Sequence, residues 1–368
     1  MSRSESKNAC KTLLLALYML VFSVLNWNCP AGLKYSGGEK PSKVVMGYYF
    51  NEGERQEFDH KKINYCYLTH IAHAFTKPDS EGNLIIDEGY IYPELVREAH
   101  EHNVKIVMSA GGWERCEGFP GMVSTAENRE RFITQVVSFC KEHHYDGVDI
   151  DWEFVSNPEE QKNFVLFIKE LSQALKAFNP PLQLSMAVPS GHFWGRWINF
   201  EELIENFDYI SFMTYDYHGE WSDHSGHNAP LYTCNNDPCG SMNDTYSYSQ
   251  IRKVPNDKLL LGVPFYGRSF DCGGLYQRFQ KSQYFRYKDV LKFLQLGWES
   301  IWDDCAKVPY LRNPEKTEII CYDDERSIFL KYKFVKEKQA AGIIIWELSQ
   351  DYDQKTAVLL DVVGKEFK

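Results

Sequence analysis

Eight short runs of strand-forming residues alternate with helical segments, and this alternation is the strongest constraint on the fold. Several runs are almost wholly apolar, as in 259–264 and 342–346, which is typical of parallel strands buried on both faces. Segments with helical periodicity, such as 128–143 and 160–178, are long enough to cross from one parallel strand to the next. The eight predicted strands are 44–50, 70–75, 105–109, 147–151, 182–188, 209–214, 259–264 and 342–346.

This order predicts an α/β protein with one (β/α)8 TIM barrel over residues 43–368. An open, doubly wound sheet is the alternative, but no glycine-rich dinucleotide-binding motif follows any predicted strand. The last two strands begin at residues 259 and 342, which are 83 apart, about 40 more than one crossover needs. We therefore expect a small α+β insertion between strands 7 and 8, over residues 270–322.

Residues 1–29 have the order of a secretory signal peptide, with basic residues first, an apolar run over 13–25, and then a polar break. The apolar run has 13 residues, whereas a membrane span needs roughly 20. We therefore expect a secreted, extracellular protein with no stable membrane association, and an uncleaved anchor is the weaker alternative. The sequence does not place the cleavage site.

The chain contains 10 cysteines, which suits the oxidising environment of an exported protein. Eight of them follow residue 29, and the sequence does not choose among their 105 possible pairings. Cys234 and Cys239 close a short loop and are the first pair that we expect to form a disulfide. Cys140 shares a helical face with apolar residues, so we predict a buried free thiol there.

The net charge and the composition restrict the kinds of ligand that the protein is suited to bind. The chain has 40 Lys and Arg against 51 Asp and Glu, a net charge of −11, and it has no long basic block. Nucleic acid is therefore an unsuitable partner, and a neutral or cationic ligand fits better. Aromatic residues make up 15% of the chain, and they can serve either as core or as a stacking surface.

The most informative motif is the acidic run 146–153, Asp-Gly-Val-Asp-Ile-Asp-Trp-Glu. Side chains alternate along a strand, so Asp149, Asp151 and Glu153 point to the same side. A solvated strand face would be the ordinary explanation, but the apolar residues between them should face the helices, which leaves the acids facing the barrel interior. Confined carboxylates repel one another and lose hydration, so at least one pKa should rise. A hard-cation site is a second interpretation, which would need oxygen ligands from elsewhere.

Residues 146–153 match the DxxDxDxE signature of glycoside hydrolase family 18, the chitinases and their relatives. The chain also resembles this family over most of the barrel, roughly residues 43–353. The further matching segments are 46–49, 109–113, 213–216, 264–268 and Trp346.

The resemblance implies a substrate-assisted mechanism, an exception to the usual pair of catalytic carboxylates. It implies that Glu153 protonates the glycosidic oxygen while the 2-acetamido group of the sugar attacks the anomeric carbon, and that Glu153 then acts as base. Asp151 would hold the acetamido N–H, Asp149 would share its proton, and Tyr215 would donate a hydrogen bond to the acetamido oxygen.

The resemblance also implies a set of substrate-binding residues. Trp346 would form the floor of the −1 subsite, and Trp113 and Trp221 would lie toward the −3 and +1 sides. The full expected set is Tyr48, Ser109, Gly112, Trp113, Met213, Asp216, Trp221, Tyr266, Arg268 and Trp346. The histidine pairs 70/73, 143/144 and 224/227 have no convergent cysteine or carboxylate in the sequence, so we expect no metal and no cofactor.

Together these features predict a monomeric chitinase acting on chitin or chitooligosaccharides. An endo-β-N-acetylglucosaminidase acting on N-glycans would keep the same acids and is the main enzymatic alternative. A non-catalytic chitin-binding lectin is the alternative from another class, but lectins on this fold typically lose the last acid of the motif, and Glu153 is present.

Overall fold

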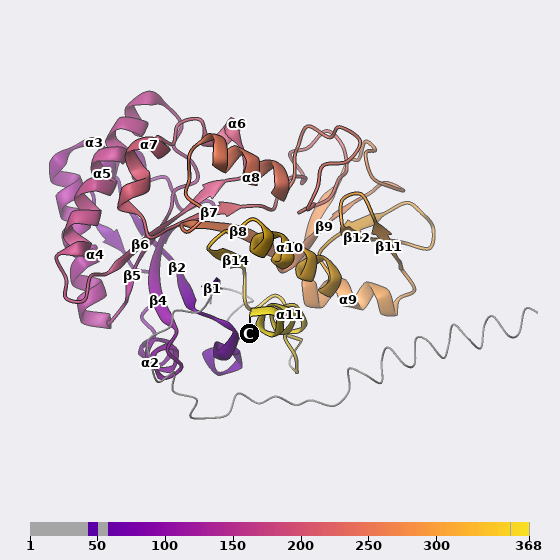
Figure 1. The fold of residues 1–368 in the computed structure, drawn as a ribbon, viewed down its shortest axis with the longest axis horizontal. Coiled ribbons are helices and arrows are strands. Elements are labelled where there is room, and N and C mark those ends of the chain that lie inside the picture. The colour runs from indigo at the N-terminus through magenta and orange to yellow at the C-terminus, as the bar shows by residue number, and fades with distance from the viewer. Residues whose placement is uncertain (1–42, 51–57, 354, 368) are drawn as a thin grey trace, which may run out of the picture. The chain divides into compact units, whose positions relative to one another are not determined.

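The computed structural model describes residues 43–50, 58–353 and 355–367. Eight parallel strands form a closed barrel, with neighbouring strands in the order β1, β14, β8, β7, β6, β5, β4 and β2, and β1 pairs with β2 to close the ring (Figure 1). The barrel strands are β1 Val44–Phe50, β2 His70–Pro78, β4 Lys105–Gly111, β5 Gly147–Asp151, β6 Gln183–Pro189, β7 Tyr209–Met213, β8 Leu259–Pro264 and β14 Gly342–Trp346. The predicted (β/α)8 barrel is confirmed.

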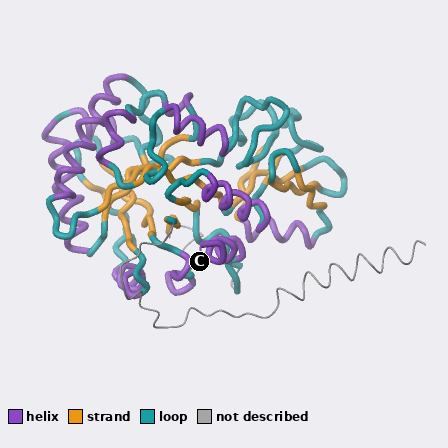
Figure 2. The backbone as a smooth tube through the Cα atoms, in the orientation of Figure 1, coloured by secondary structure: helices purple, strands orange, loops and turns teal. Residues whose placement is uncertain are grey.

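Helices and loops enclose the barrel strands, as Figure 2 shows. The helices outside the insertion are α2 Pro93–Glu101, α3 Phe119–Ser124, α4 Ala126–His143, α5 Pro158–Lys176, α6 His192–Gly195, α7 Phe200–Leu203, α8 Met242–Ile251, α10 Glu325–Glu337 and α11 Val358–Phe367. In addition, β3 Leu84–Ile85 pairs antiparallel with the end of β2.

Side-chain caps explain where several crossover helices begin. The side chain of Thr125 accepts a hydrogen bond from the backbone of Asn128 at the start of α4, and Asn157 caps α5 in the same way. Each helix then turns an apolar face to the barrel; in α4 this face includes the fully buried Phe132 and Val136. Most of the core therefore lies between the strands and the surrounding helices.

A second sheet lies between β8 and β14 along the chain. Its strands are β9 Tyr266–Phe270, β10 Ser282–Arg286, β11 Glu299–Asp303, β12 Val308–Arg312 and β13 Ile319–Cys321, accompanied by helix α9 Tyr287–Gln295. All its pairings are antiparallel, in the order β10, β9, β13, β12, β11. Because β9 begins two residues after β8 ends, Tyr266 and Arg268 belong to this sheet and not to the seventh barrel strand.

The cysteine pairing differs from our prediction. Cys234 bonds to Cys305, with Cα atoms 6.0 Å apart, and Cys239 is free, so the predicted Cys234–Cys239 bond is wrong. The backbone N–H of Cys239 donates to Asp237 Oδ1 at 3.0 Å in a local turn, while the insertion brings Cys305 to Cys234. Cys140 is a buried free thiol, as predicted.

The predicted signal peptide, 1–29, lies outside the described residues. Among the residues that the structure describes, no helix is both long and apolar enough to cross a membrane.

Candidate active site

Asp149, on β5, is fully buried at the centre of the barrel. It accepts hydrogen bonds from three other barrel strands: from Tyr48 Oη at 2.9 Å, Ser109 Oγ at 2.8 Å and Ser185 Oγ at 2.6 Å. Burial raises the pKa of Asp149, and the three hydrogen bonds lower it in part. The ring of hydroxyl groups therefore holds this carboxyl in one orientation.

Asp151 is the last residue of β5 and is only 4% exposed. Its Oδ1 is buried and has no hydrogen-bond partner among the described residues. Burial, and then the charges of Glu153 and Asp149, raise the pKa of Asp151 well above its ordinary value. A buried carboxyl oxygen without a partner is costly, so this atom is suited to a donor from a ligand.

Glu153 lies just beyond the strand and lines a surface hollow of about 410 Å³ together with Cys116, Trp152 and Phe154. Burial, followed by the charge of Asp216, raises the pKa of Glu153 to about 8, although a hydrogen bond from the Trp113 backbone opposes this. Glu153 therefore keeps its proton through neutral pH, as a general acid must.

The loop after β7 supplies Tyr215 and Asp216. Asp216 adopts the left-handed conformation, with φ of 59°, and its Oδ1 accepts from Tyr266 Oη at 2.8 Å and from Arg268 Nε at 2.7 Å. Tyr215 packs with Met213 and Trp346. Burial and then the charge of Asp151 raise the pKa of Tyr215 well above its ordinary value, so its hydroxyl remains a hydrogen-bond donor.

Aromatic rings follow several strand ends. Trp346 ends β14 and packs against Tyr48 and Phe75, with ring centroids 5.3 and 5.7 Å away. Trp113 is 68% exposed and Trp221 55% exposed, which fits surface stacking and not core packing.

Arg268 and Gly112 each lie against an aromatic ring of this region. The guanidinium of Arg268 lies 4.6 Å from the ring centroid of Trp221. Gly112 has φ of +89°, and a Cβ there would lie 2.7 Å from the Phe75 ring, so a larger residue would not fit.

The structure thus brings the predicted acids, Tyr215, Asp216 and their hydroxyl partners together at the carboxyl ends of the barrel strands, with the exposed tryptophans around them. The sequence analysis missed Ser185, the third partner of Asp149. It also missed Phe193 and Trp194, which follow β6 and are 66% and 57% exposed. Two adjacent aromatic residues shortly after a predicted strand were the sequence feature that could have indicated these positions.

One expectation about histidine is wrong. His224 lies beside a cysteine and a carboxylate, because the loop after β7 folds back and brings it to His218, Asp237 and Cys239. The four residues are up to 21 positions apart in the sequence, so no local motif indicated that they would lie together.

Comparison with known proteins identifies the family of the chain. The family model described as glycosyl hydrolases family 18 matches residues 44–351. Chitinase 1 of Aphanocladium album is 32% identical over 77% of this chain and 75% of its own length. Chitinase A1 of Niallia circulans is 31% identical over 68% of this chain, but this match spans only 41% of that protein.

Solved structures give the same result. The crystal structure of Ostrinia furnacalis Group II chitinase catalytic domain 2 has a TM-score of 0.81 and 26% identity, covering 89% of this chain and 96% of that one. The Ostrinia furnacalis Group IV chitinase in complex with allosamidin has a TM-score of 0.79 and 25% identity, over 88% of this chain and 98% of that one. The chain therefore belongs to family 18 of the glycosyl hydrolases.

Proposed function

We propose that this protein is a secreted chitinase that hydrolyses β-1,4 linkages between N-acetylglucosamine units by substrate-assisted catalysis with retention. The observation that carries the proposal is the buried Oδ1 of Asp151, which has no hydrogen-bond partner among the described residues. In the sequence Asp151 stands between Asp149, which accepts three hydrogen bonds, and Glu153, whose pKa is raised by burial. This arrangement offers an acceptor for an amide N–H next to an acid for the glycosidic oxygen.

In the first step, Glu153 would donate its proton to the glycosidic oxygen as the bond to the anomeric carbon breaks. The carbonyl oxygen of the sugar's own 2-acetamido group would attack that carbon from the opposite face and form an oxazolinium ion. In the second step, the Glu153 carboxylate would take a proton from water, which attacks the same carbon and reopens the ring. Two inversions give net retention.

Asp151 and Tyr215 would orient the internal nucleophile. Asp151 Oδ1 would accept from the acetamido N–H and stabilise the positive charge that develops on the ring. The Tyr215 hydroxyl, whose raised pKa keeps it protonated, would donate to the acetamido oxygen. Asp149, held by three hydroxyl groups, would share a proton with Asp151 and tune its charge.

The substrate class follows from the exposed aromatic rings. Trp113, Trp221 and the α6 pair Phe193 and Trp194 offer flat apolar faces past the strand ends. Stacking on several such rings suits a linear chain of sugars better than a branched N-glycan. The Ostrinia Group II domain has been solved as an E2180L mutant with penta-N-acetylchitooctaose, and it is 25% identical to this chain. The signal-like segment 1–29 supports secretion.

The decisive experiment is Glu153→Gln. Because the variant keeps shape but loses the transferable proton, we expect kcat on chitotetraose to fall by about 10²–10⁴-fold, with chitotetraose binding largely retained. Glu117→Gln, in the same hollow but with an exposed side chain, is the matched control and should keep parental activity. Residual Glu153→Gln activity within tenfold of the parent would contradict the mechanism.

A parallel assay on a high-mannose glycoprotein separates the substrate classes. We expect hydrolysis of chitotetraose and no release of glycan. Glycan release without chitotetraose cleavage would favour the endo-β-N-acetylglucosaminidase instead, and binding without cleavage of either would favour the lectin.

A further inference from the structure

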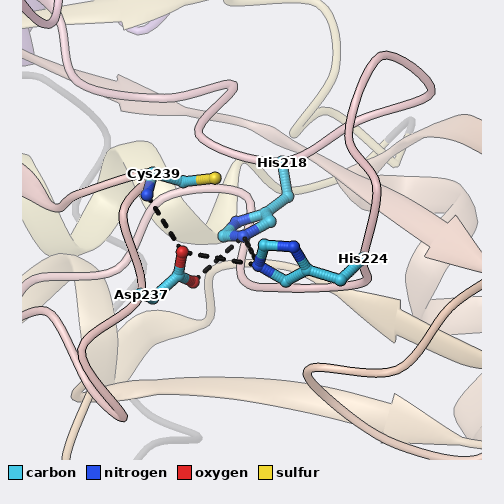
Figure 3. Close-up of side chains that lie close together, drawn as sticks. All are labelled: His218, His224, Asp237 and Cys239. Carbon is cyan, nitrogen blue, oxygen red and sulfur yellow. Dashed lines mark hydrogen bonds and ion pairs between the residues drawn. The ribbon is translucent and has the colours of Figure 1, made fainter.

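Four potential metal ligands converge on the long loop between β7 and α8, outside the proposed catalytic residues. They are His218, His224, Asp237 and Cys239, and their ligand atoms all lie within 4.8 Å of one another (Figure 3). Imidazole nitrogen, carboxylate oxygen and thiolate sulfur are the ligands that zinc uses in proteins.

The distances between the nitrogen and oxygen atoms match a shared ion. His218 Nε2 and His224 Nε2 are 3.3 Å apart. Asp237 places Oδ2 at 3.0 Å from His218 Nε2 and Oδ1 at 3.5 Å from His224 Nε2. Two ligands about 2.0–2.1 Å from one tetrahedral zinc ion lie about 3.3–3.4 Å apart, so the two imidazole nitrogens already have the required spacing, and a carboxylate oxygen of Asp237 lies near each of them.

The outer nitrogen of each imidazole contacts an acceptor. His218 Nδ1 lies 3.0 Å from the carbonyl oxygen of His227, and His224 Nδ1 contacts the carboxylate of Asp223. In the tautomer with the hydrogen on each Nδ1, both Nε2 atoms can bind an ion, and an acceptor at the outer nitrogen is the usual arrangement for metal-bound histidine. Without an ion, His218 Nε2 would instead carry a hydrogen toward Asp237 Oδ2, which is 3.0 Å away.

The cluster is also held in place. His218 is fully buried, and its ring packs on Gly226 so closely that a Cβ there would lie 2.3 Å from the ring. The Asp237 side chain is only 7% exposed, and it accepts the backbone N–H of Cys239. The Cys234–Cys305 disulfide anchors the same loop, and Cys239 is not in a disulfide.

We propose that His218, His224, Asp237 and Cys239 bind one zinc ion in a closed structural site. Zinc–sulfur bonds are about 2.3 Å long, so the sulfur, which lies within 4.8 Å of the other ligand atoms, would move inward to complete the site. The ion would brace the loop that carries Tyr215, Asp216 and Trp221. The competing explanation is a metal-free ion pair in which a proton on His218 faces Asp237.

The test measures metal directly and does not depend on catalysis. The full chain, without a histidine tag, would be treated with a chelator, dialysed against zinc and then against buffer, and analysed by mass spectrometry for metals. We expect about one zinc per chain and a rise in Tm on adding zinc. Cys239→Ser and His224→Gln should each weaken zinc binding at least tenfold and reduce the rise in Tm.

Cys272→Ser and His143→Gln, which lie outside the cluster, are the matched controls and should bind zinc like the parent. Cobalt offers a second measurement on the parent itself: we expect a tetrahedral visible spectrum with a thiolate-to-cobalt band that Cys239→Ser removes. Substoichiometric zinc in the parent, equal zinc in the parent and both cluster variants, or a cobalt spectrum without the thiolate band would each overturn the proposal.

Discussion

At the scale of single residues, the site depends on where each carboxyl is placed relative to its neighbours. Asp149 is satisfied by three hydroxyl groups, whereas Asp151 Oδ1 has no partner among the described residues. Glu153 differs from both because it lines a surface hollow and its acidity responds to Asp216. Three acids on one strand end therefore suit three different roles.

The pH dependence of activity tests this assignment. The pKa of Glu153 is raised to about 8, so its proton is retained through neutrality and lost as the pH rises through that value. Asp216→Asn removes the charge that contributes to this rise, so the alkaline limb of kcat/KM should move to lower pH. The measurement is the pH profile, because Asp216 also holds Tyr266 and Arg268 and its loss will lower the rate at every pH.

Glu117→Gln is the control for this profile, because Glu117 is exposed and lies in the same hollow without acting on Glu153. Its alkaline limb should coincide with that of the parent. An Asp216→Asn limb that stays in place, or moves to higher pH, would contradict the proposed coupling.

The acids of the site could be predicted from the sequence, but not all of the residues that donate hydrogen bonds to them. Alternation along one strand shows that Asp149 and Asp151 share a face, since this depends only on neighbouring residues. The contact with Ser185 depends on the register between β5 and β6, which pairs Asp149 with Ser185, and no local pattern encodes that register. The sequence analysis missed the cluster of His218, His224, Asp237 and Cys239 for the same reason, since the cluster forms only when a long loop folds back.

At the scale of elements, the barrel strands were the most predictable part. β1, β5, β8 and β14 have the predicted bounds. In β1, β8 and β14 a largely apolar run defines a buried parallel strand, and in β5 acids alternate with apolar residues. The sequence did not reveal that the chain leaves the barrel at Phe265 and begins β9 at Tyr266, because both sides of this junction are apolar or aromatic.

The start of α10 offers a test of buried charge. Lys331 Nζ lies 2.6 Å from both carboxylate oxygens of Asp323, and both residues are at most 1% exposed. Lys331→Met keeps the volume but leaves the Asp323 charge buried without its cation, so the free energy of unfolding should fall by about 3–5 kcal/mol. Urea denaturation checks this value.

Two further variants make that measurement decisive. Lys333→Met, on the exposed side of the same helix, should change stability by no more than about 0.5 kcal/mol. Combining Lys331→Met with Asp323→Asn removes both charges and should recover part of the loss. If Lys331→Met is as stable as the parent, the ion pair is not needed for the stability of α10.

At the scale of the whole barrel and insertion, the loop after β7 joins the insertion through several contacts besides those of Asp216, and two of them involve the side chains of Cys234 and His227. One is the Cys234–Cys305 disulfide, and the other is the contact between His227 Nε2 and Asp303 Oδ2 at 3.0 Å. Both lie on the loop that carries Trp221. We infer that the insertion supports one wall of the proposed substrate groove.

Removing the disulfide tests this inference. Cys234→Ser combined with Cys305→Ser releases a cross-link between residues 71 apart in the chain, so unfolding should become easier by about 2–5 kcal/mol. Asp149 and Asp151 lie on β5 and Glu153 lies just beyond it, so of the proposed catalytic residues only Tyr215 is on this loop. We therefore expect a small change in kcat on chitotetraose and a larger rise in KM for longer chitooligosaccharides, as Trp221 loses its support. Cys272→Ser, a buried free cysteine in the same insertion, controls for the loss of a thiol and should leave KM unchanged. A double variant with lower stability but parental KM for every chain length would show that the disulfide holds the fold without shaping the groove.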